Sequence, residues 1–453
     1  MQKPKCATVT LTVLPNAKRI EHARSFRRVK LVVGDRLTCG ATRTASPTSN
    51  DPRISYFPSM TASHTFASIV LALAKASPGT EPLAHLDYPQ ELAIKTAALR
   101  QFWDQAHLHG TPNPVAPSPK PRGYRTTTKR RVSCSRGKVY VHFEDAPGDQ
   151  PVAASLLEPT EHQVLYRLMH EKLSGKPYRH LATHVNYLII RGSYQEFCVL
   201  FNVDALDAEI VRKCRLLADH ARAADPRVKS AFIFHDPLRS RYYFESCAPE
   251  GSLRLKKLFG FDQLQLRIEN RQYRYAPTIF SQVNESMLPV MLSRVRSLVR
   301  PSGHERLIDL YCGYGLFALD LADRCGEVIG IDANESAIAS ARGNARFAPE
   351  SCSVRFIADS ITPASLMSAL QRLLRQAELL ILDPPRQGTA EGVIEYCASR
   401  KPARAAHIFC GVDQIPRELR EWERMGYRPA AIEPLDMFAG TPNLEVVIGL
   451  EQI

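Results

Sequence analysis

The sequence lacks several features that mark familiar classes of protein. Its 453 residues include 11 cysteines but no Cys-x-x-Cys pair, a scattered pattern typical of reduced cytosolic thiols rather than of a secreted disulfide framework. No apolar run approaches the roughly 20 residues that a membrane span needs. The first residues also lack the basic and apolar pattern of an export signal. We therefore expect a cytoplasmic protein with no membrane partner.

Acidic residues are scarce in one part of the chain. Lys and Arg number 59 and Asp and Glu 46, for a net charge of +13. Residues 301–453 contain 15 Lys and Arg and 21 Asp and Glu. The remaining 44 Lys and Arg and 25 Asp and Glu give residues 1–300 a net charge of +19. A scattered positive charge often serves solubility alone, whereas its concentration in one part favours a polyanionic partner such as a nucleic acid.

The densest basic segment contains no acid anywhere between residues 105 and 143. A solvated face is an equally weighted interpretation, but the missing acids argue against a salt-bridged helix face. Tyr124 lies within the segment and offers a ring on which a base could stack. We predict that this segment binds nucleic acid through Lys120, Arg122, Tyr124, Arg125, Lys129, Arg130 and Arg131.

The pattern of apolar residues divides the chain into three parts. Residues 1–80 form a basic N-terminal region that we leave unassigned, although two short runs in it are strand-like. Residues 81–275 begin with a helical period from Tyr88 to about Trp103, pass through a Pro-rich crossing and continue as an α+β domain. Residues 276–453 alternate strand and helix, which predicts an α/β fold with a doubly wound, mostly parallel sheet.

A nucleotide-type site is indicated near the start of this last part. A buried-type strand leads into Gly313-Tyr314-Gly315 and then into a helix, and small residues at such a turn let a ligand approach the backbone. A lone Gly-x-Gly is weak evidence, but Asp332 and Asp359 end the next two strands at the same expected edge. The loop lacks the Lys-Ser/Thr of a P-loop, and Ala318 occupies the third glycine position of a dehydrogenase fingerprint.

The fourth strand of this part ends in Asp383-Pro384-Pro385-Arg386. Two prolines directly after a buried strand stop both helix and sheet and hold the backbone rigid. In nucleic-acid methyltransferases, an acid-Pro-Pro turn at this point faces the target base beside the methyl donor. The position of the turn in the strand order carries more weight than the motif itself.

From about Asp87 to Ile453 the sequence resembles the 5-methyluridine RNA methyltransferases, the family that modifies transfer and ribosomal RNA. The resemblance rests on eight segments in the same order. They are YPQELAIKTAAL, PKPRGYRTTTKRRV, APTIFSQVNESM, DLYCGYG, VIGID, DPPRQG, HIFCGVDQIPREL and PLDMFAGTPNLEVVIGL.

The resemblance implies a class I methyltransferase domain over residues 276–453, S-adenosylmethionine as cofactor, and tRNA or rRNA as partner of a monomer. It places the nucleophile at Cys410 and the proton-abstracting base at Glu445. No metal site is expected, and the absence of cysteine from residues 40–133 excludes the iron–sulfur cluster that many members carry before the helix at Tyr88. With the glycine turn and the strand ends, the cofactor-binding positions are Gln282, Tyr311, Gly313, Gly315, Asp332, Asp359 and Asp383.

The chemistry requires one nucleophile and one base. Carbon 5 of uracil becomes nucleophilic only after a thiolate adds to carbon 6, and the proton on carbon 5 must then be removed before the thiolate can leave. A single cysteine is otherwise most often a small buried hydrophobe, and Glu445 could instead form a structural salt bridge. Arg386 is our candidate for stabilising the thiolate, and we interpret Asp436 as a positioning residue. Cys312 is interpreted as structural, although a two-cysteine mechanism would use it.

Departures from the family pattern motivate an alternative. Gly411 and Val412 stand where members usually have Asn-Pro, and Leu316 stands where Asn is common. A catalytically lapsed relative that only binds RNA would tolerate these changes, but it would have no reason to keep both Cys410 and Glu445. A nicotinamide-dependent dehydrogenase explains neither the acid-Pro-Pro turn nor the basic part of the chain.

Overall fold

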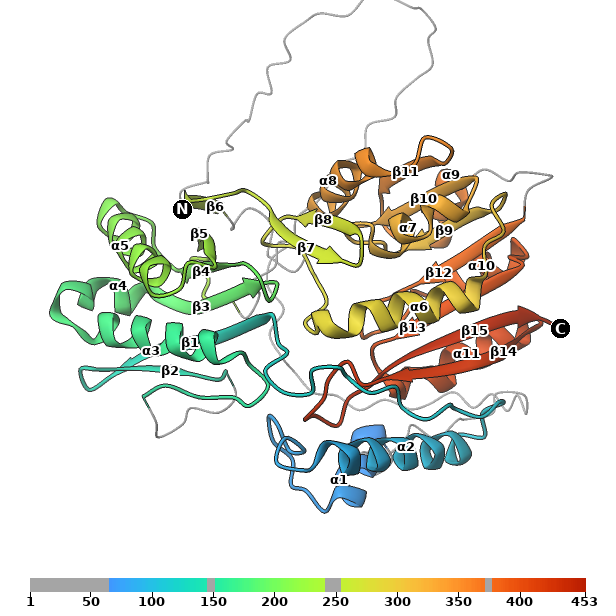
Figure 1. Ribbon diagram of the computed structural model, residues 1–453, viewed down its shortest axis with the longest axis horizontal. Coiled ribbons are helices and arrows are strands. Elements are labelled where there is room, and N and C mark those ends of the chain that lie inside the picture. Colours follow the sequence, from blue (N-terminus) through green and yellow to red (C-terminus); the bar gives the residue numbers. More distant parts are fainter. Residues whose placement is uncertain (1–64, 145–150, 241–253, 371–376) are drawn as a thin grey trace, which may run out of the picture. The chain divides into compact units, whose positions relative to one another are not determined.

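The computed structural model describes residues 65–144, 151–240, 254–370 and 377–453 (Figure 1). The strand-like runs expected before residue 65 lie outside these ranges. No helix in the described ranges is both long and apolar enough to cross a lipid bilayer.

The C-terminal part is built on a seven-stranded sheet in the order β11-β10-β9-β12-β13-β15-β14. Neighbouring strands from β11 to β13 run parallel, and β15 is antiparallel to both β13 and β14. The doubly wound, mostly parallel sheet is therefore confirmed. The strands are β9 (Arg306–Leu310), β10 (Glu327–Asp332), β11 (Ser353–Ala358), β12 (Glu378–Leu382), β13 (Arg404–Phe409), β14 (Tyr427–Leu435) and β15 (Glu445–Gln452).

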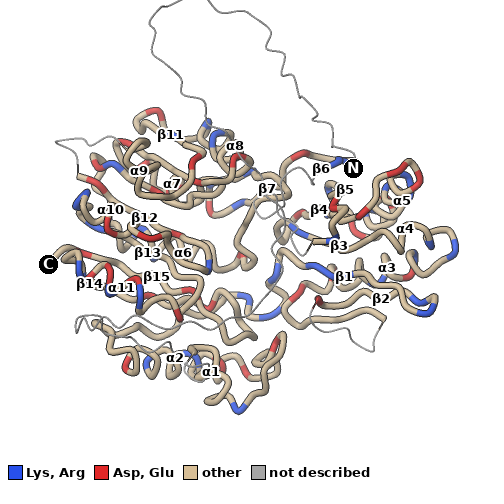
Figure 2. Tube along the Cα trace, turned by 180° about the vertical axis from the view of Figure 1, so that it is seen from behind, with Lys and Arg blue, Asp and Glu red and all other residues tan. Residues whose placement is uncertain are grey.

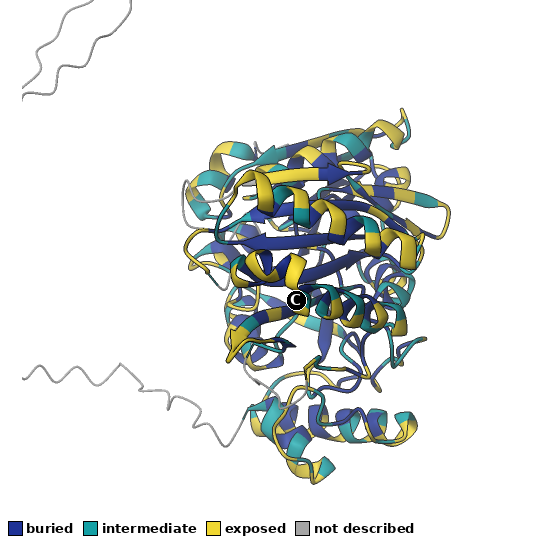
Figure 3. Cartoon of the chain, turned by 90° about the vertical axis from the view of Figure 1, so that its left-hand side faces the viewer, coloured by how far each residue is buried: buried dark blue, intermediate teal, exposed yellow. Residues whose placement is uncertain are grey.

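Helices cover both faces of this sheet because its central strands are apolar on both sides. Every residue of β9 and β12 is buried, as expected of parallel strands between two helical layers, and the strands lie dark blue behind helices with yellow outer sides in Figure 3. One face packs on α6 (Leu288–Val299), α7 (Leu316–Asp320) and α8 (Glu335–Asn344). The other packs on α9 (Pro363–Ala369), α10 (Val393–Ser399) and α11 (Ile415–Arg424).

Two helices from the start of the described chain also belong to this second face. They are α1 (Phe66–Ala74) and α2 (Tyr88–Gln105), and α2 buries Leu99, Phe102 and Trp103 in the same core as strands β12 to β15. The helix at Tyr88 is confirmed. However, it shares its core with the C-terminal sheet, whereas the expected boundary assigned it to a separate domain of residues 81–275.

The middle domain is an α+β layer pair between residues 127 and 259, with a six-stranded sheet in the order β2-β1-β3-β4-β5-β6. One face packs on helices α3 to α5, and the other shares a core with the β7–β8 hairpin and α6. The elements of the domain are β1 (Thr127–Ser135), β2 (Lys138–His142), α3 (Thr160–Ser174), α4 (Arg179–His184), β3 (Val185–Gly192), β4 (Phe197–Val203), α5 (Ala208–Ala224), β5 (Val228–His235) and β6 (Arg254–Phe259). The hairpin that follows the domain consists of β7 (Leu264–Ile268) and β8 (Arg271–Tyr275).

The chain enters and leaves the middle domain at neighbouring points. Residues 106–126 cross irregularly beside β14, as the prolines predicted, and end where the N–H of Thr126 donates to the carbonyl of Val283 at 2.9 Å. The N–H of Gly192 donates to the Thr126 carbonyl at 3.1 Å, and the Gly192 carbonyl accepts from the hydroxyl of Tyr275, at the end of β8, at 3.3 Å.

Candidate active site

The polar residues predicted for the site follow strands that end at one edge of the sheet. Because β9 to β13 are parallel, their carboxyl ends meet there, which is where open α/β sheets bind ligands. The residues that the structure brings to this edge are Tyr311 after β9, Asp332 at the end of β10, Asp359 after β11, Asp383 after β12 and Cys410 after β13.

The turn after β9 is held in an unusual backbone conformation. Tyr311, Gly313 and Gly315 all have positive φ, at 64°, 54° and 85°, a region that a residue with a side chain adopts at a cost of about 1–2 kcal/mol. Asp332 holds this turn, since its carboxylate accepts from the N–H of Gly313 at 2.9 Å and from that of Asn334 at 2.8 Å. The carboxylate of Asp332 therefore holds both the turn after β9 and the start of α8 in place.

Gly315 is the position in this turn where an added methyl group has least room. A Cβ there would lie 2.9 Å from the Phe356 ring, in a backbone conformation that already disfavours alanine. We expect Gly315→Ala to lower the free energy of unfolding by about 2–4 kcal/mol, as strain and overpacking add. Urea unfolding measures this loss. Gly343→Ala, in α8 with nothing within 4 Å of the added atom, should not destabilise the protein, and equal losses for the two variants would contradict the prediction.

Three carboxyl groups, of which one is fully buried, cluster behind the turn. Asp309 in β9 is fully buried, and its Oδ2 accepts from the N–H of Ala318 at 2.9 Å while its Oδ1 has no hydrogen-bond partner among the described residues. Burial raises the pKa of Asp309 well above its ordinary value, and Asp383 and Asp332 nearby raise it further. Burial and the charge of Asp332 raise the pKa of Asp383 to about 7. Such a cluster is most stable with a cation beside it.

Cys410 and Glu445 face each other across neighbouring strands. The antiparallel ladder of β13 and β15 pairs Phe409 with Val446, so the next step of the same register sets Cys410 opposite Glu445. The Cys410 Sγ lies 3.8 Å from the carbonyl oxygen of Pro384. Glu445 is 2% exposed, and its Oε2 has no hydrogen-bond partner within the described ranges.

The electrostatics of this pair confirm that it adjoins the acid-Pro-Pro turn. Burial raises the pKa of the Cys410 thiol to about 12, with Asp383 and Glu445 adding to the effect and Arg386 opposing it. Burial also raises the pKa of Glu445 well above its ordinary value, again with Asp383 adding and Arg386 opposing. Arg386 therefore acts in the predicted direction on the thiol, but burial and the two carboxyl groups outweigh it.

The segment APTIFSQVNESM, which contains Gln282, is hydrogen-bonded to the chain that leads into Glu445. Gln282 is 8% exposed, and its neighbour Ser281 accepts from an Nη atom of Arg191 at 2.9 Å. Two residues on, the Asn284 side chain donates to the carbonyl of Met437 at 3.2 Å, in the connection that leads into Glu445.

Two residues predicted to contact RNA are part of the core. Tyr124 has no exposed surface and its hydroxyl donates to the Ala439 carbonyl at 2.9 Å, so its ring cannot stack on a base. Arg130 is 1% exposed and binds both carboxylate oxygens of Glu158, at 2.7 and 2.6 Å. The prediction is wrong for both, because Tyr124 binds a backbone carbonyl in the core and Arg130 binds an acid from outside the segment.

Other members of the basic segment have partners as well. Arg122 donates to the Glu91 carboxylate at 2.9 Å, Lys129 lies 2.9 Å from Glu144, and the Lys120 ammonium lies 4.1 Å from the centre of the Tyr194 ring. Arg125 is half-buried. The exposed cations of the segment lie along β1 and its turn into β2, where Figure 2 shows blue positions, and they are Arg131, Arg136 and Lys138.

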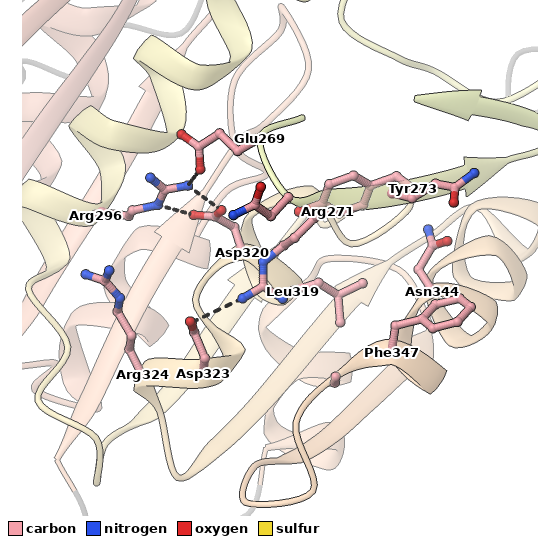
Figure 4. Close-up of a pocket in the computed structure, with 13 residues that line it drawn as sticks. Glu269, Arg271, Tyr273, Arg296, Leu319, Asp320, Asp323, Arg324, Asn344 and Phe347 are labelled. Atoms are coloured by element: carbon pink, nitrogen blue, oxygen red, sulfur yellow. Dashed lines mark hydrogen bonds and ion pairs between the residues drawn. The ribbon is translucent and has the colours of Figure 1, made fainter. Parts of the chain in front are cut away.

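A cavity of about 550 Å³ lies away from this edge, beyond the far end of α7. Five of its six charged side chains pair with one another, as the dashed lines in Figure 4 show: Arg296 binds Asp320 and Glu269, and Arg271 lies 3.3 Å from Asp323. These pairs leave the cavity without the clustered like charges found at the sheet edge.

The sheet order and the turns at its edge define the class I methyltransferase fold. A solved structure with the same fold is the tRNA (uracil-54, C5)-methyltransferase of Pyrococcus abyssi in complex with S-adenosyl-L-homocysteine. It has a TM-score of 0.59 and 21% identity, and the match covers 83% of this chain and 85% of that one.

Residues 248–453 match the tRNA (uracil-5-)-methyltransferase family model. An uncharacterized RNA methyltransferase of Oceanobacillus iheyensis is 24% identical, over 81% of this chain and 80% of its own length. Others from Thermosynechococcus vestitus and Halalkalibacterium halodurans are 32% and 28% identical, over 39% and 52% of this chain. The matched parts span 38% and 50% of those two proteins.

Proposed function

We propose that this protein is an S-adenosylmethionine-dependent methyltransferase that forms 5-methyluridine in transfer or ribosomal RNA. The observation that carries the proposal is the pairing of Cys410 with Glu445 beside the Asp383 turn. A nucleophile and a base on adjacent strands, next to a turn that faces the target base in related enzymes, are the minimum set for methylation at carbon 5.

The residues at the sheet edge suit this cofactor. S-adenosylmethionine carries a sulfonium and an ammonium group, and when bound it supplies the methyl group and leaves as S-adenosylhomocysteine. The buried carboxyl group of Asp309 and the half-buried one of Asp383, with their raised pKa values, are the partners that such a cation requires. Asp332 would take the ribose hydroxyls, Asp359 would lie beside the adenine, and the turn at Gly313 would admit the ligand to the backbone.

The reaction divides between two side chains. The Cys410 thiolate adds to carbon 6 of the uracil, and the electron pair of the carbon 5–carbon 6 double bond becomes available for carbon 5 to take the methyl group. Glu445 then removes the proton from carbon 5, the double bond forms again, and the carbon–sulfur bond breaks with its electrons returning to Cys410. Burial supports the second role, because a carboxylate with a raised pKa is a stronger base.

Two of the departures from the family pattern are packing residues. Val412 is 3% exposed and packs in the core shared with α2, and Leu316 is 5% exposed and packs in the core on the opposite face. Neither change removes a residue of the Cys410–Glu445 pair. This favours an active enzyme over a lapsed RNA-binding relative.

Product analysis tests the proposal directly. The full chain would be incubated with unmodified tRNA and rRNA and with a cofactor labelled in its methyl group, and the digested nucleosides separated by chromatography with mass detection. We expect label in 5-methyluridine. Label in another nucleoside would contradict the proposal, and RNA binding without any methylated product would favour the lapsed relative.

The exposed cations of β1 and of its turn into β2 provide a prediction for RNA affinity. Replacing Arg131, Arg136 and Lys138 together with alanine should weaken RNA binding about tenfold near 0.1 M salt and flatten its salt dependence, because fewer phosphate contacts release fewer counterions. Filter binding at several salt concentrations measures both effects. The control removes three exposed cations from the catalytic domain, at Lys401, Arg424 and Arg428, and a loss of the same size there would show that only overall charge matters.

A further inference from the structure

The connection from β14 to β15, residues 436–444, ends at Glu445 and is held by side chains from distant parts of the chain. Its Met437 carbonyl accepts from Asn284 at 3.2 Å, and its Ala439 carbonyl accepts from the Tyr124 hydroxyl at 2.9 Å. The N–H of Gly440 donates to Oε1 of Glu91, in α2, at 2.5 Å. Three segments of the family resemblance thus converge on one short loop.

A buried ionic network anchors the start of this loop. The side chains of Glu91, Lys95 and Asp436 have no exposed surface. The Lys95 ammonium lies 2.6 Å from Asp436 and 2.8 Å from Glu91, and the Tyr88 hydroxyl donates to the second oxygen of Asp436 at 2.9 Å. Arg122 supplies a second cation to Glu91 at 2.9 Å, which balances the two carboxylates.

Stability alone does not explain this network. Removing charges from water is costly, and a buried ion pair is often no more stabilising than apolar side chains of similar volume. Its hydrogen bonds do, however, fix the backbone beside Asp436 in one geometry. Asp436 directly follows Leu435, which pairs with Glu445 in the ladder of β14 and β15.

We propose that Tyr88, Lys95 and Asp436 are positioning residues that hold Glu445 in place for removal of the carbon 5 proton. The inference rests on the proposed function and assigns the network to one step of it. Glu445 is the first residue of β15 and adjoins the loop, whereas Cys410 follows β13, which is paired along its length with β12 and β15. Loosening the loop should therefore displace the base more than the nucleophile.

Tyr88→Phe tests the inference with a small change, since it removes one hydroxyl and leaves the charges balanced. RNA labelled with tritium at carbon 5 of uridine and a cofactor labelled with carbon-14 in its methyl group separate the two steps. Methyl transfer into the protein–RNA adduct should continue near the wild-type rate. Tritium release should slow by about 10- to 100-fold, the range expected for a misplaced catalytic group, so that methylated adduct accumulates on a denaturing gel.

Lys95→Met is a second variant with a larger expected effect, and thermal unfolding of both variants separates loss of the fold from loss of the step. Tyr427→Phe is the matched control: it removes another buried hydroxyl, bound to the Pro402 carbonyl at 2.9 Å, at the opposite end of β14. Equal slowing of methyl transfer and tritium release in Tyr88→Phe, or no accumulated adduct, would overturn the inference while leaving the function intact. Wild-type protein that forms no 5-methyluridine would overturn both.

Discussion

Replacing Cys410 with alanine should reduce formation of 5-methyluridine to below about one thousandth of the wild-type rate, because it removes the sulfur atom that forms the bond to carbon 6. Among the described residues, Cys312 is the other thiol near the turn, but it is 4% exposed, and burial raises its pKa well above the ordinary value. The variant should also form no covalent complex with RNA. Labelled methyl incorporation and a denaturing gel measure the two losses.

The control for this variant is Cys397→Ala, another buried thiol, on α10. It should retain activity, since Cys397 lines a small cavity together with Glu378, at the amino end of β12. Turnover by Cys410→Ala at the wild-type rate would rule out the mechanism, and comparable losses in both variants would point to damaged packing instead.

The pH dependence of the wild-type enzyme should follow the same two groups. Cys410 must lose a proton to attack, and its pKa is raised to about 12. Glu445 must be ionised to accept a proton, and its pKa is also raised. Both shifts make the reactive forms scarcer at low pH, so the single-turnover rate should climb as the pH rises from about 6 to 9.

Replacing Glu445 with glutamine should leave the reaction stopped after methyl transfer. The amide has nearly the shape of the carboxyl group but cannot take the proton from carbon 5, so the carbon–sulfur bond to Cys410 cannot break. We expect an adduct between protein and methylated RNA that survives a denaturing gel, together with a loss of turnover of at least about 100-fold.

Glu433→Gln is the matched control, because Glu433 lies on the neighbouring strand β14 and pairs with Val447 of β15. That variant should turn over normally and accumulate no adduct. A Glu445→Gln protein that releases product at the wild-type rate would show that another group removes the proton.

Much of the fold could be predicted because its signals are local. The buried runs of β9, β12 and β13 and the turn at Gly313 each lie within a few consecutive residues, and the order of parallel strands then brings their ends together. The closeness of Cys410 and Glu445 was implied by the resemblance, which assigned them the nucleophile and the base of one reaction. Their exact opposition, by contrast, depends on the register of β13 against β15, which no local pattern specifies.

The roles of the basic segment could not be predicted because partners at long range decide them. Nothing in the sequence near Arg130 distinguishes it from an exposed cation, but it is buried in an ion pair with Glu158. The role of Lys95 was not predicted for the same reason, because its partner, Asp436, is 341 residues away in the sequence. One local clue existed: Glu91 and Lys95 are four residues apart on a face of α2 that is otherwise apolar.

The hydrogen bonds around Gly192 imply that the fold of residues 127–259 is an insertion in a host. The host polypeptide is interrupted after Thr126 and resumes with the β7–β8 hairpin, and both junctions contact the same glycine. An inserted domain of this kind can change in length or sequence without separating the two parts of the chain that flank it. Conversely, a fragment starting at residue 276 would lose α2 and expose the apolar side of β12 to β15. It would also leave the Asp436 carboxylate without its ion-pair partner, Lys95.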